Sequence, residues 1–190
     1  MKAVDSAAEI DFALLDNNEG AFKKEYSTKE YYGSLANEES YREFFAKLQV
    51  FYEDREDEYE DLLDENEDLT LAEYAGRVKP FIIFVPDMPS LLEMLPKEKD
   101  FEKSVATLIQ NSWKMGMHFV LGGISNKTGK AYDAISDVFK QQKSGIVLTK
   151  LNEQHILEAS NKNYNEPSLL PYEAYYTRNN FGQKLKLPKV

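Results

Sequence analysis

Few side chains in this sequence have the type and spacing that catalysis requires. There is no cysteine, which excludes a thiol nucleophile, a disulfide scaffold and a cysteine metal site. The two histidines are far apart in sequence, and a zinc site needs roughly three or four converging ligands. His118 lies in an apolar stretch and is predicted to be a buried core residue, whereas His155 is predicted to lie on the surface of an amphipathic helix. The sequence therefore predicts no metal centre.

One aspartate stands where a functional carboxylate is often found. The apolar run from Pro80 to Pro86 (PFIIFVP) has the length of a strand that is covered on both faces, and Asp87 follows it directly. Phe84, inside this run, is predicted to be buried. A carboxylate at the end of such a strand can hold Mg²⁺ beside phosphates. The structural alternative is a polar residue that closes the strand before a Pro-Ser turn, and both interpretations stay open.

Nucleotide binding lacks its usual sequence signal. No G-x-x-x-x-G-K-[ST] motif occurs in the 190 residues. The nearest stretches, GGISNKTGK from Gly122 and GQK from Gly182, have the wrong spacing of Gly and Lys to wrap phosphates onto a helix N-terminus. The first of them is typical of a simple turn. The chain as given is therefore predicted not to hydrolyse ATP and to use no cofactor.

The net charge of −10 is concentrated in one segment. Residues 53–68, which we call the acidic ridge, hold eleven acidic side chains and one arginine, and the rest of the chain is balanced. Such a distribution argues against nucleic acid as a ligand, because phosphate backbones are bound by clustered Lys and Arg. The ridge also lacks the spaced oxygens of an EF-hand. It is predicted to be a solvated helix face, with a docking surface for a basic partner as the alternative.

The elements that must position these residues alternate along the chain. Strands are predicted at 9–16, 80–86, 117–121, 144–149, 173–177 and 183–187. Helices are predicted at 37–68, 101–113, 132–142 and 152–160. Residues 20–37 are predicted to form a loop with one short helix, and 69–76 a turn and a short helix. Asn37 is a good helix start, because it can cap the first turn and two glutamates follow it. The alternation predicts a single α/β domain over 1–190, a layered fold with a largely parallel sheet flanked by helices.

Several segments resemble a known family. FIIFVPD is a strand that ends in Asp, GMHFVLGG is a strand that follows an amphipathic helix, and GIVLTKL precedes a strand pair that ends in KLKLP. With EIDFALLDNNEG near the start, they resemble the C-terminal half of FtsK/SpoIIIE-type P-loop ATPase modules, in particular the terminal modules of type VII secretion motors of Gram-positive bacteria. The resemblance covers roughly residues 9–187 and implies a degenerate RecA/P-loop-like fold that lacks the P-loop.

The resemblance implies a pseudo-ATPase. It places Asp87 at the Walker B position, as a vestigial nucleotide-binding carboxylate. The next position, which can carry a catalytic acid in active relatives, is Met88, and methionine cannot deprotonate water. The strand at 116–121 ends in a polar sensor residue in active members. Here two glycines stand at that point and two polar residues follow slightly later: Gly122, Gly123, Ser125 and Asn126.

The function implied by the resemblance is protein recognition in a secretion motor. Such a terminal module helps to select secreted substrates or machinery proteins through a hydrophobic pocket that receives a helical signal, for which flexible thioethers are well suited. The residues expected to bind the partner are Met88, Met94, Trp113, Met115, Tyr172 and Tyr175. The expected location is cytoplasmic, at the inner face of the cell membrane, through tethering to upstream ATPase domains.

Two alternative functions stay open. The chain can be a true ATPase module whose P-loop lies on a missing upstream segment. It can also be a free-standing acidic inhibitor that binds other proteins through the acidic ridge. The chain itself has no apolar run of the length of a membrane span and no signal peptide at its start.

Overall fold

The computed structural model describes residues 11–17, 19–95, 99–123, 133–142, 144–157, 159–160, 165–179 and 181–188. The chain divides into two compact units, Met1–Gly122 and Gly123–Val190. That the units behave as one domain stays a prediction. Within the described ranges, no helix combines the length and the apolar character that a membrane crossing needs.

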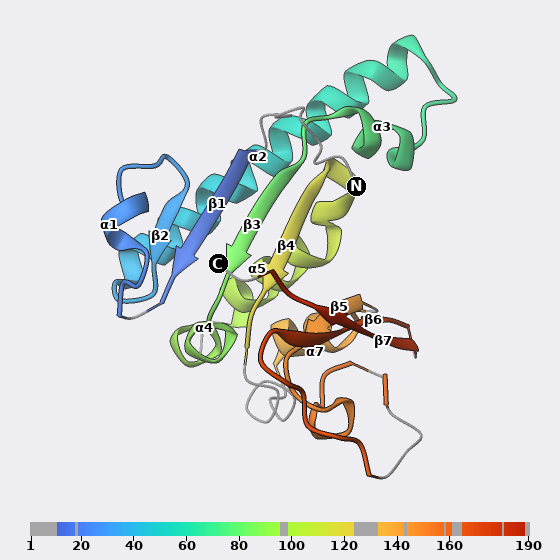
Figure 1. Ribbon diagram of the computed structural model, residues 1–190. Helices are drawn as coiled ribbons and strands as arrows, with labels where there is room; N and C mark the ends of the chain where they lie inside the picture. The colour runs from blue at the N-terminus through green and yellow to red at the C-terminus, as the bar shows by residue number, and fades with distance from the viewer. Residues whose placement is uncertain are drawn as a thin grey trace. The chain divides into compact units, whose positions relative to one another are not determined.

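The first unit is built on a parallel sheet of four strands in the order β2-β1-β3-β4 (Figure 1). The strands are β1 (Asp11–Asp16), β2 (Tyr32–Ser34), β3 (Phe81–Val85) and β4 (Met117–Leu121). β1, β3 and β4 confirm three predicted strands. β2 lies in a segment predicted as loop with one short helix, and that helix is α1 (Lys23–Tyr26).

The long helix α2 (Glu38–Glu65) begins as predicted. The Asn37 side chain accepts a hydrogen bond from the Glu39 amide at 2.9 Å. One side of the helix is buried, and Phe51 stacks on Phe81 of β3 with ring centroids 4.4 Å apart. α2 thus covers the sheet face that carries Phe81 (Figure 1). The buried side chains of α2 are Tyr41, Phe44, Phe45, Leu48 and Tyr52, and burying one large apolar side chain stabilises a fold by about 1.5–3 kcal/mol.

The remaining helices of this unit lie between β2 and β4 in sequence. They are α3 (Leu71–Arg77), α4 (Met88–Met94), α5 (Lys99–Asn111) and the 3₁₀ turn η1 (Ser112–Met115). α5 packs on α2 through Phe101, whose ring lies 6.3 Å from that of Tyr41. The segment ends at Gly116, as predicted, because its φ of 66° is left-handed and favours glycine.

The parallel sheet carries apolar side chains on both faces, but among the described residues long helices cover one face only. Phe81, Ile83 and Val85 point to the covered face and have no exposed surface. Phe84 points the other way and is 40% exposed, and His118 of β4 is exposed as well. The predictions that Phe84 and His118 are buried are therefore wrong. Successive side chains of a strand alternate between faces, and a continuous apolar run does not show that both faces are covered.

The second unit contains a separate antiparallel sheet of order β5-β6-β7. Its elements are α7 (Ala134–Lys140), β5 (Ser144–Val147), the 3₁₀ turn η2 (Leu151–Glu153), β6 (Glu173–Arg178) and β7 (Phe181–Lys186). A small core of Val147, Leu151, Ala159 and Tyr175 fills one side of this unit. The largely parallel sheet predicted from the sequence therefore corresponds to the first unit.

The helix predicted at 152–160 does not form in the described part of that range. The Gln154 side chain takes the place of helical hydrogen bonds. It donates to the carbonyl oxygens of Leu157 and Ala159 at 2.6 and 2.8 Å, and it accepts from the amides of Ile156 and Leu157 at 3.0 and 2.7 Å. A side chain that binds nearby backbone groups in this way competes with a helix. His155 is exposed as predicted, but it lies in this irregular segment.

Candidate partner-binding surfaces

The carboxyl end of the parallel sheet carries two aspartates with different surroundings. Asp16, at the end of β1, has no exposed surface. Its carboxylate accepts from the amides of Asn17 and Phe22 and from the Tyr32 hydroxyl, each at 2.9 Å. Burial, together with this hydrogen bond to Asp16, raises the pKa of Tyr32 to about 12. Asp16 therefore stabilises the loop that follows β1 through these hydrogen bonds.

Asp87, two residues beyond the end of β3, is the N-cap of α4. Its carboxylate accepts from the Ser90 amide at 3.2 Å and from the Ser90 hydroxyl at 2.6 Å. This arrangement satisfies donors at the start of a helix and accounts for an aspartate at this position. The cap agrees with the structural interpretation of Asp87, and the inherited Walker B role stays a prediction.

The glycine expected at the sensor position has a packing role. The amide of Gly122 donates to the Val85 carbonyl, and its own carbonyl accepts from the Met88 amide, both at 2.8 Å. A Cβ atom on Gly122 would lie 2.6 Å from the Pro86 carbonyl oxygen. Only glycine allows the chains after β3 and β4 to approach this closely. Ser125, Asn126 and the rest of the GGISNKTGK segment after Gly123 lie outside the described residues.

The six residues predicted to bind a partner do not form one surface. Met88, Met115 and Tyr175 are buried, with exposed fractions of 0%, 3% and 7%. Met94 is half-buried, whereas Trp113 and Tyr172 are exposed at 51% and 49%. The expectation of a methionine-lined surface is therefore corrected, because two of its three methionines fill the core of the first unit.

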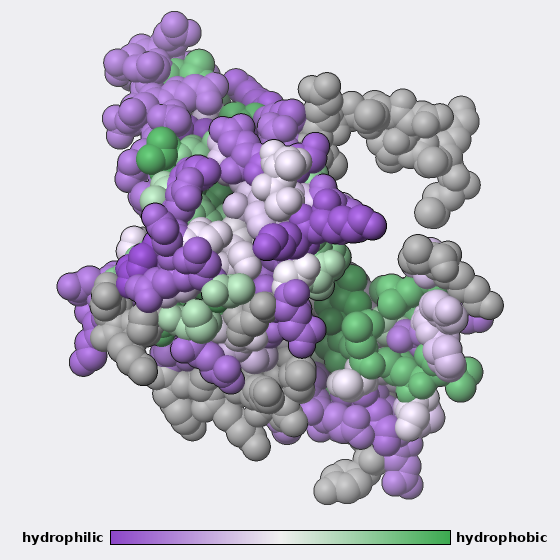
Figure 2. Space-filling view, turned by 90° about the vertical axis from the view of Figure 1, so that its left-hand side faces the viewer, coloured by the Kyte–Doolittle hydropathy of each residue, from purple (hydrophilic) through white to green (hydrophobic). Residues whose placement is uncertain are grey.

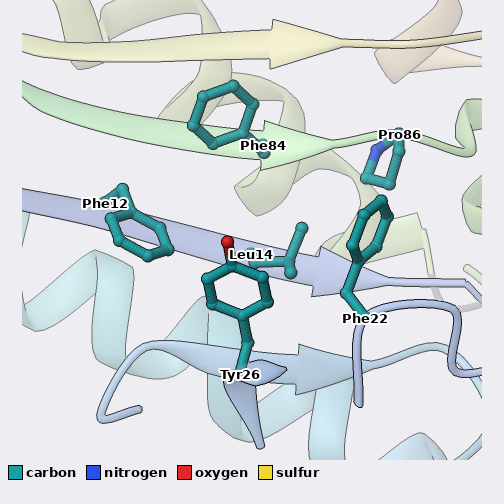
Figure 3. A pocket seen from close by; sticks show the side chains of 6 residues that line it. All are labelled: Phe12, Leu14, Phe22, Tyr26, Phe84 and Pro86. Atoms are coloured by element: carbon teal, nitrogen blue, oxygen red, sulfur yellow. The ribbon is translucent and has the colours of Figure 1, made fainter. Parts of the chain in front are cut away.

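An apolar pocket of about 330 Å³ lies on the open face of the parallel sheet (Figure 3). Side chains of β1 and β3 meet the segment around α1 there, and the Phe12 and Tyr26 rings pack edge to face at 5.6 Å. The Tyr26 hydroxyl is the only polar side-chain group of the lining, and none of the lining residues is charged. The lining residues are Phe12, Leu14, Phe22, Tyr26, Phe84 and Pro86. This pocket was not predicted from the sequence, although the alternation of side chains along a strand, which places Phe12 and Leu14 on one face of β1, was a signal for it.

The antiparallel sheet of the second unit exposes three apolar side chains on one face, which also carries Arg178. Ile146 of β5 lies directly opposite Tyr176 of β6, and Phe181 of β7 lies opposite Arg178, two residues further along β6. Ile146, Tyr176 and Phe181 therefore point to the same side, and their exposed fractions are 61%, 41% and 68%. We call these three residues the β5–β7 patch. The patch does not include Tyr172 or Tyr175, the two tyrosines near it that were predicted to bind a partner.

The acidic ridge contains both anchored and solvated groups. Glu58 accepts from the Tyr74 hydroxyl at 2.8 Å, and Glu56 accepts from Tyr52, whose pKa burial and this contact raise to about 12. Arg55 donates to the carbonyls of Met115 and Lys79, so it holds the ridge against the sheet. The other acidic side chains of 53–65 are exposed. Figure 2 shows that the top of the molecule, where α2 ends, is predominantly hydrophilic, which agrees with a solvated face.

The described part of the chain offers no site for a metal ion. No three His, Asp or Glu side chains within it converge closely enough to act as ligands. The histidines are exposed and distant in sequence, and the buried carboxylate of Asp16 is occupied by backbone and tyrosine donors.

Comparison with known proteins gives similarities to EccC and EssC. No protein-family model matches the chain. The ESX secretion system protein EccC of Geobacillus thermodenitrificans (strain NG80-2) is 31% identical over 113 residues, which is 58% of this chain and 7% of EccC. The solved cytoplasmic domain of EssC has a TM-score of 0.76 at 22% identity, and EssC (ATPases 2 and 3) from Geobacillus thermodenitrificans has a TM-score of 0.74 at 20% identity.

The chain corresponds to a small part of these relatives. Both solved structures cover 94% of it, while it covers 34% and 31% of theirs. The fold of the whole chain is thus that of a module within a longer protein in each relative. These similarities in sequence and in fold agree with the order of strands and helices that resembles the FtsK/SpoIIIE family. The chain is thus similar in sequence to part of EccC and in fold to part of the cytoplasmic domain of EssC, as the resemblance to FtsK/SpoIIIE-type modules implies.

Proposed function

We propose that the chain is a nucleotide-independent module of a type VII secretion motor that recognises a secreted substrate or a protein of the secretion machinery. The similarity to EccC and EssC supports a place in a secretion motor. The absence of a G-x-x-x-x-G-K-[ST] motif from the 190 residues supports a role without nucleotide. By analogy with these longer relatives, the module is tethered to ATPase domains in the cytoplasm, at the inner face of the membrane.

The observation that carries protein recognition is the β5–β7 patch. An antiparallel sheet commonly has one solvated face, and that face is normally polar. Here the exposed face presents Ile146, Tyr176 and Phe181 together. Contiguous exposed apolar groups mark sites of protein interaction, and tyrosine is among the residues enriched in binding hot spots. A helix with an apolar stripe is the partner that this face suits best.

Charge substitution on the patch tests the proposal. Ile146→Arg and Phe181→Arg should each weaken binding of a purified secreted protein of the same system by at least about tenfold, since a buried hot-spot side chain contributes about 2 kcal/mol or more. Val50→Arg is the matched control, because Val50 is also apolar and is 55% exposed on α2. Isothermal calorimetry gives the affinities. Unchanged binding by both patch variants would contradict the proposal.

An ATPase module whose P-loop lies on another segment is the second candidate. It is favoured by the place of Asp87, just beyond the end of a central parallel strand, where phosphate-bound Mg²⁺ is held in such enzymes. We expect no heat of binding when the chain is titrated with millimolar Mg-ATP, because it supplies no phosphate-binding loop and no lysine within one. A saturable isotherm that Asp87→Ala abolishes would favour the second candidate instead.

A further inference from the structure

Tyr172 has a backbone conformation that tyrosine rarely adopts. It lies directly before β6, and its φ of 65° is in the left-handed region. Among the described residues, the other positions with a left-handed φ are Gly20, Gly116 and Asn179. Glycine has no Cβ atom to clash in this conformation and asparagine tolerates it, whereas a bulky side chain is an outlier there. Tyr172 therefore occupies a position that suits glycine.

The turn around Tyr172 has the form of a type II β-turn. The Glu173 amide donates to the Leu170 carbonyl at 3.0 Å, which closes a four-residue turn with Pro171 and Tyr172 at its centre. Proline is common at the first central position of a type II turn, whereas the second requires a positive φ and is normally glycine or asparagine. The dipeptide Pro-Tyr thus stands where Pro-Gly would form the same turn without strain.

Neighbouring groups hold this turn in place. The Glu173 carboxylate accepts from the Leu170 amide at 2.8 Å and from the Lys184 ammonium group at 2.6 Å. The Leu187 amide donates to the Tyr172 carbonyl at 2.7 Å. None of these contacts uses the Tyr172 ring, so they would hold a glycine at this position as well. A strained conformation that the surroundings fix in this way is typical of binding and active sites.

The Tyr172 side chain lies at the surface, at the other end of β6 from Phe181. Phe181 is paired with Arg178, the last residue of β6, whereas Tyr172 precedes the first. Tyr172 is 49% exposed. Two more apolar side chains near it are exposed: Leu170 in the same turn, at 66%, and Leu148, which follows β5 beside the start of β6, at 65%. The second unit therefore exposes apolar side chains at both ends of this strand.

We propose that Tyr172 is a second binding residue for the helix that the β5–β7 patch binds, and that the strained turn is retained because the partner uses the ring. This inference rests on the proposed function. From Tyr172 to Arg178 the extended chain spans about 20 Å, which a helix of about 13 residues matches. The β6–β7 hairpin carries more basic than acidic side chains, namely Arg178, Lys184 and Lys186 against Glu173. The matching helix therefore has acidic residues beside its apolar stripe.

Replacing Tyr172 by glycine separates binding from folding, because the two expected effects have opposite signs. In the 190-residue chain, Tyr172→Gly should raise the melting temperature by about 2–4 °C, since glycine adopts this φ freely. It should weaken binding of a purified secreted protein of the same system at least about fivefold in isothermal calorimetry, because the ring is lost. Asn179→Gly is the matched control. It changes another left-handed residue next to β6 and should alter neither value.

The outcomes distinguish this inference from the proposed function. Tyr172→Phe keeps the ring, so its melting temperature and affinity should stay close to those of the unchanged chain. If Tyr172→Gly binds normally while Phe181→Arg weakens binding, the inference is overturned and the proposed function stands. If Phe181→Arg and Ile146→Arg also leave binding unchanged, the proposed function fails with it. A lower melting temperature for Tyr172→Gly would show that the fold needs the ring and would also overturn the inference.

Discussion

The two sheets of this protein each have one buried face and one apolar open face, but the two open faces differ in what they require. In the parallel sheet, Phe12 and Phe84 occupy positions that helices cover in most parallel sheets. In the antiparallel sheet, neighbouring strands need no crossover helix on either face, so Ile146 and Phe181 are not explained by a missing crossover. The exposed apolar residues of the first face therefore occupy positions that helices normally cover, whereas those of the second face need another explanation, and we propose that they form a surface for binding.

The largest expected effect is the difference in stability loss between substitutions on the two faces of the parallel sheet. Phe81→Ala removes a ring that has no exposed surface and that stacks on Phe51, so it should lower the free energy of unfolding by about 3–5 kcal/mol. Phe84→Ala in the 190-residue chain should cost about 1 kcal/mol, because the ring is already partly in water. Urea denaturation measures both values. Equal losses would mean that the open face is as well packed as the covered one.

A smaller loss of stability is expected when the buried carboxylate of either unit is removed. Glu166 accepts from the amides of Leu151 and Asn152 at 3.0 and 3.1 Å, much as Asp16 accepts from Asn17 and Phe22 in the first unit. Asp16→Ala and Glu166→Ala should each cost about 1–3 kcal/mol, because they leave buried amide donors without acceptors. Urea denaturation, followed with one spectroscopic probe in each unit, would show whether each substitution destabilises its own unit alone. If each substitution lowered the unfolding midpoint of both units equally, the single domain expected from the sequence would be favoured.

Sequence patterns predicted most elements of the first unit, because long apolar periodicity and caps such as Asn37 are local signals. They could not show that Phe84 is exposed, since an apolar strand has the same composition whether one or both of its faces are covered. The burial of Met88 and Met115 was likewise missed, because methionine suits both a core and an adaptable surface. The helix predicted at 152–160 was wrong because the Gln154 side chain hydrogen-bonds to the backbone of residues that follow it closely, a local competitor of the helix that helix propensity does not include.

The pH dependence of stability should reveal the hydrogen bond from the Tyr32 hydroxyl to Asp16. The pKa of Tyr32 is raised from 10.0 in the unfolded chain to about 12 by burial and by its hydrogen bond to Asp16. The unfolded state therefore loses its proton first, and the stabilisation present below about pH 10 is lost as the pH rises towards about 12. Tyr32→Phe should make this alkaline loss shallower, as measured by urea midpoints from pH 9 to pH 12. A variant with an unchanged alkaline slope would contradict the assignment.

The smallest effect concerns the acidic ridge, which belongs to neither open face. Converting Asp57, Glu60, Asp61 and Asp64 to Asn or Gln should leave stability unchanged or raise it by a few tenths of a kcal/mol, because like charges repel and oppose the helix dipole. Glu56 and Glu58 are kept, since they accept from tyrosines. A tenfold fall in the rate of partner association at low salt would instead identify the ridge as a docking surface.

We propose that the β5–β7 patch of the second unit binds protein and that the open face of the first unit takes no part in this binding. The deciding experiment is to measure the affinity of the 190-residue chain for a secreted protein with Phe181→Arg and with Phe84→Arg. Phe181→Arg should weaken binding by at least about tenfold, and Phe84→Arg should leave it unchanged. Loss of binding with Phe84→Arg and normal binding with Phe181→Arg would overturn this assignment of the two faces.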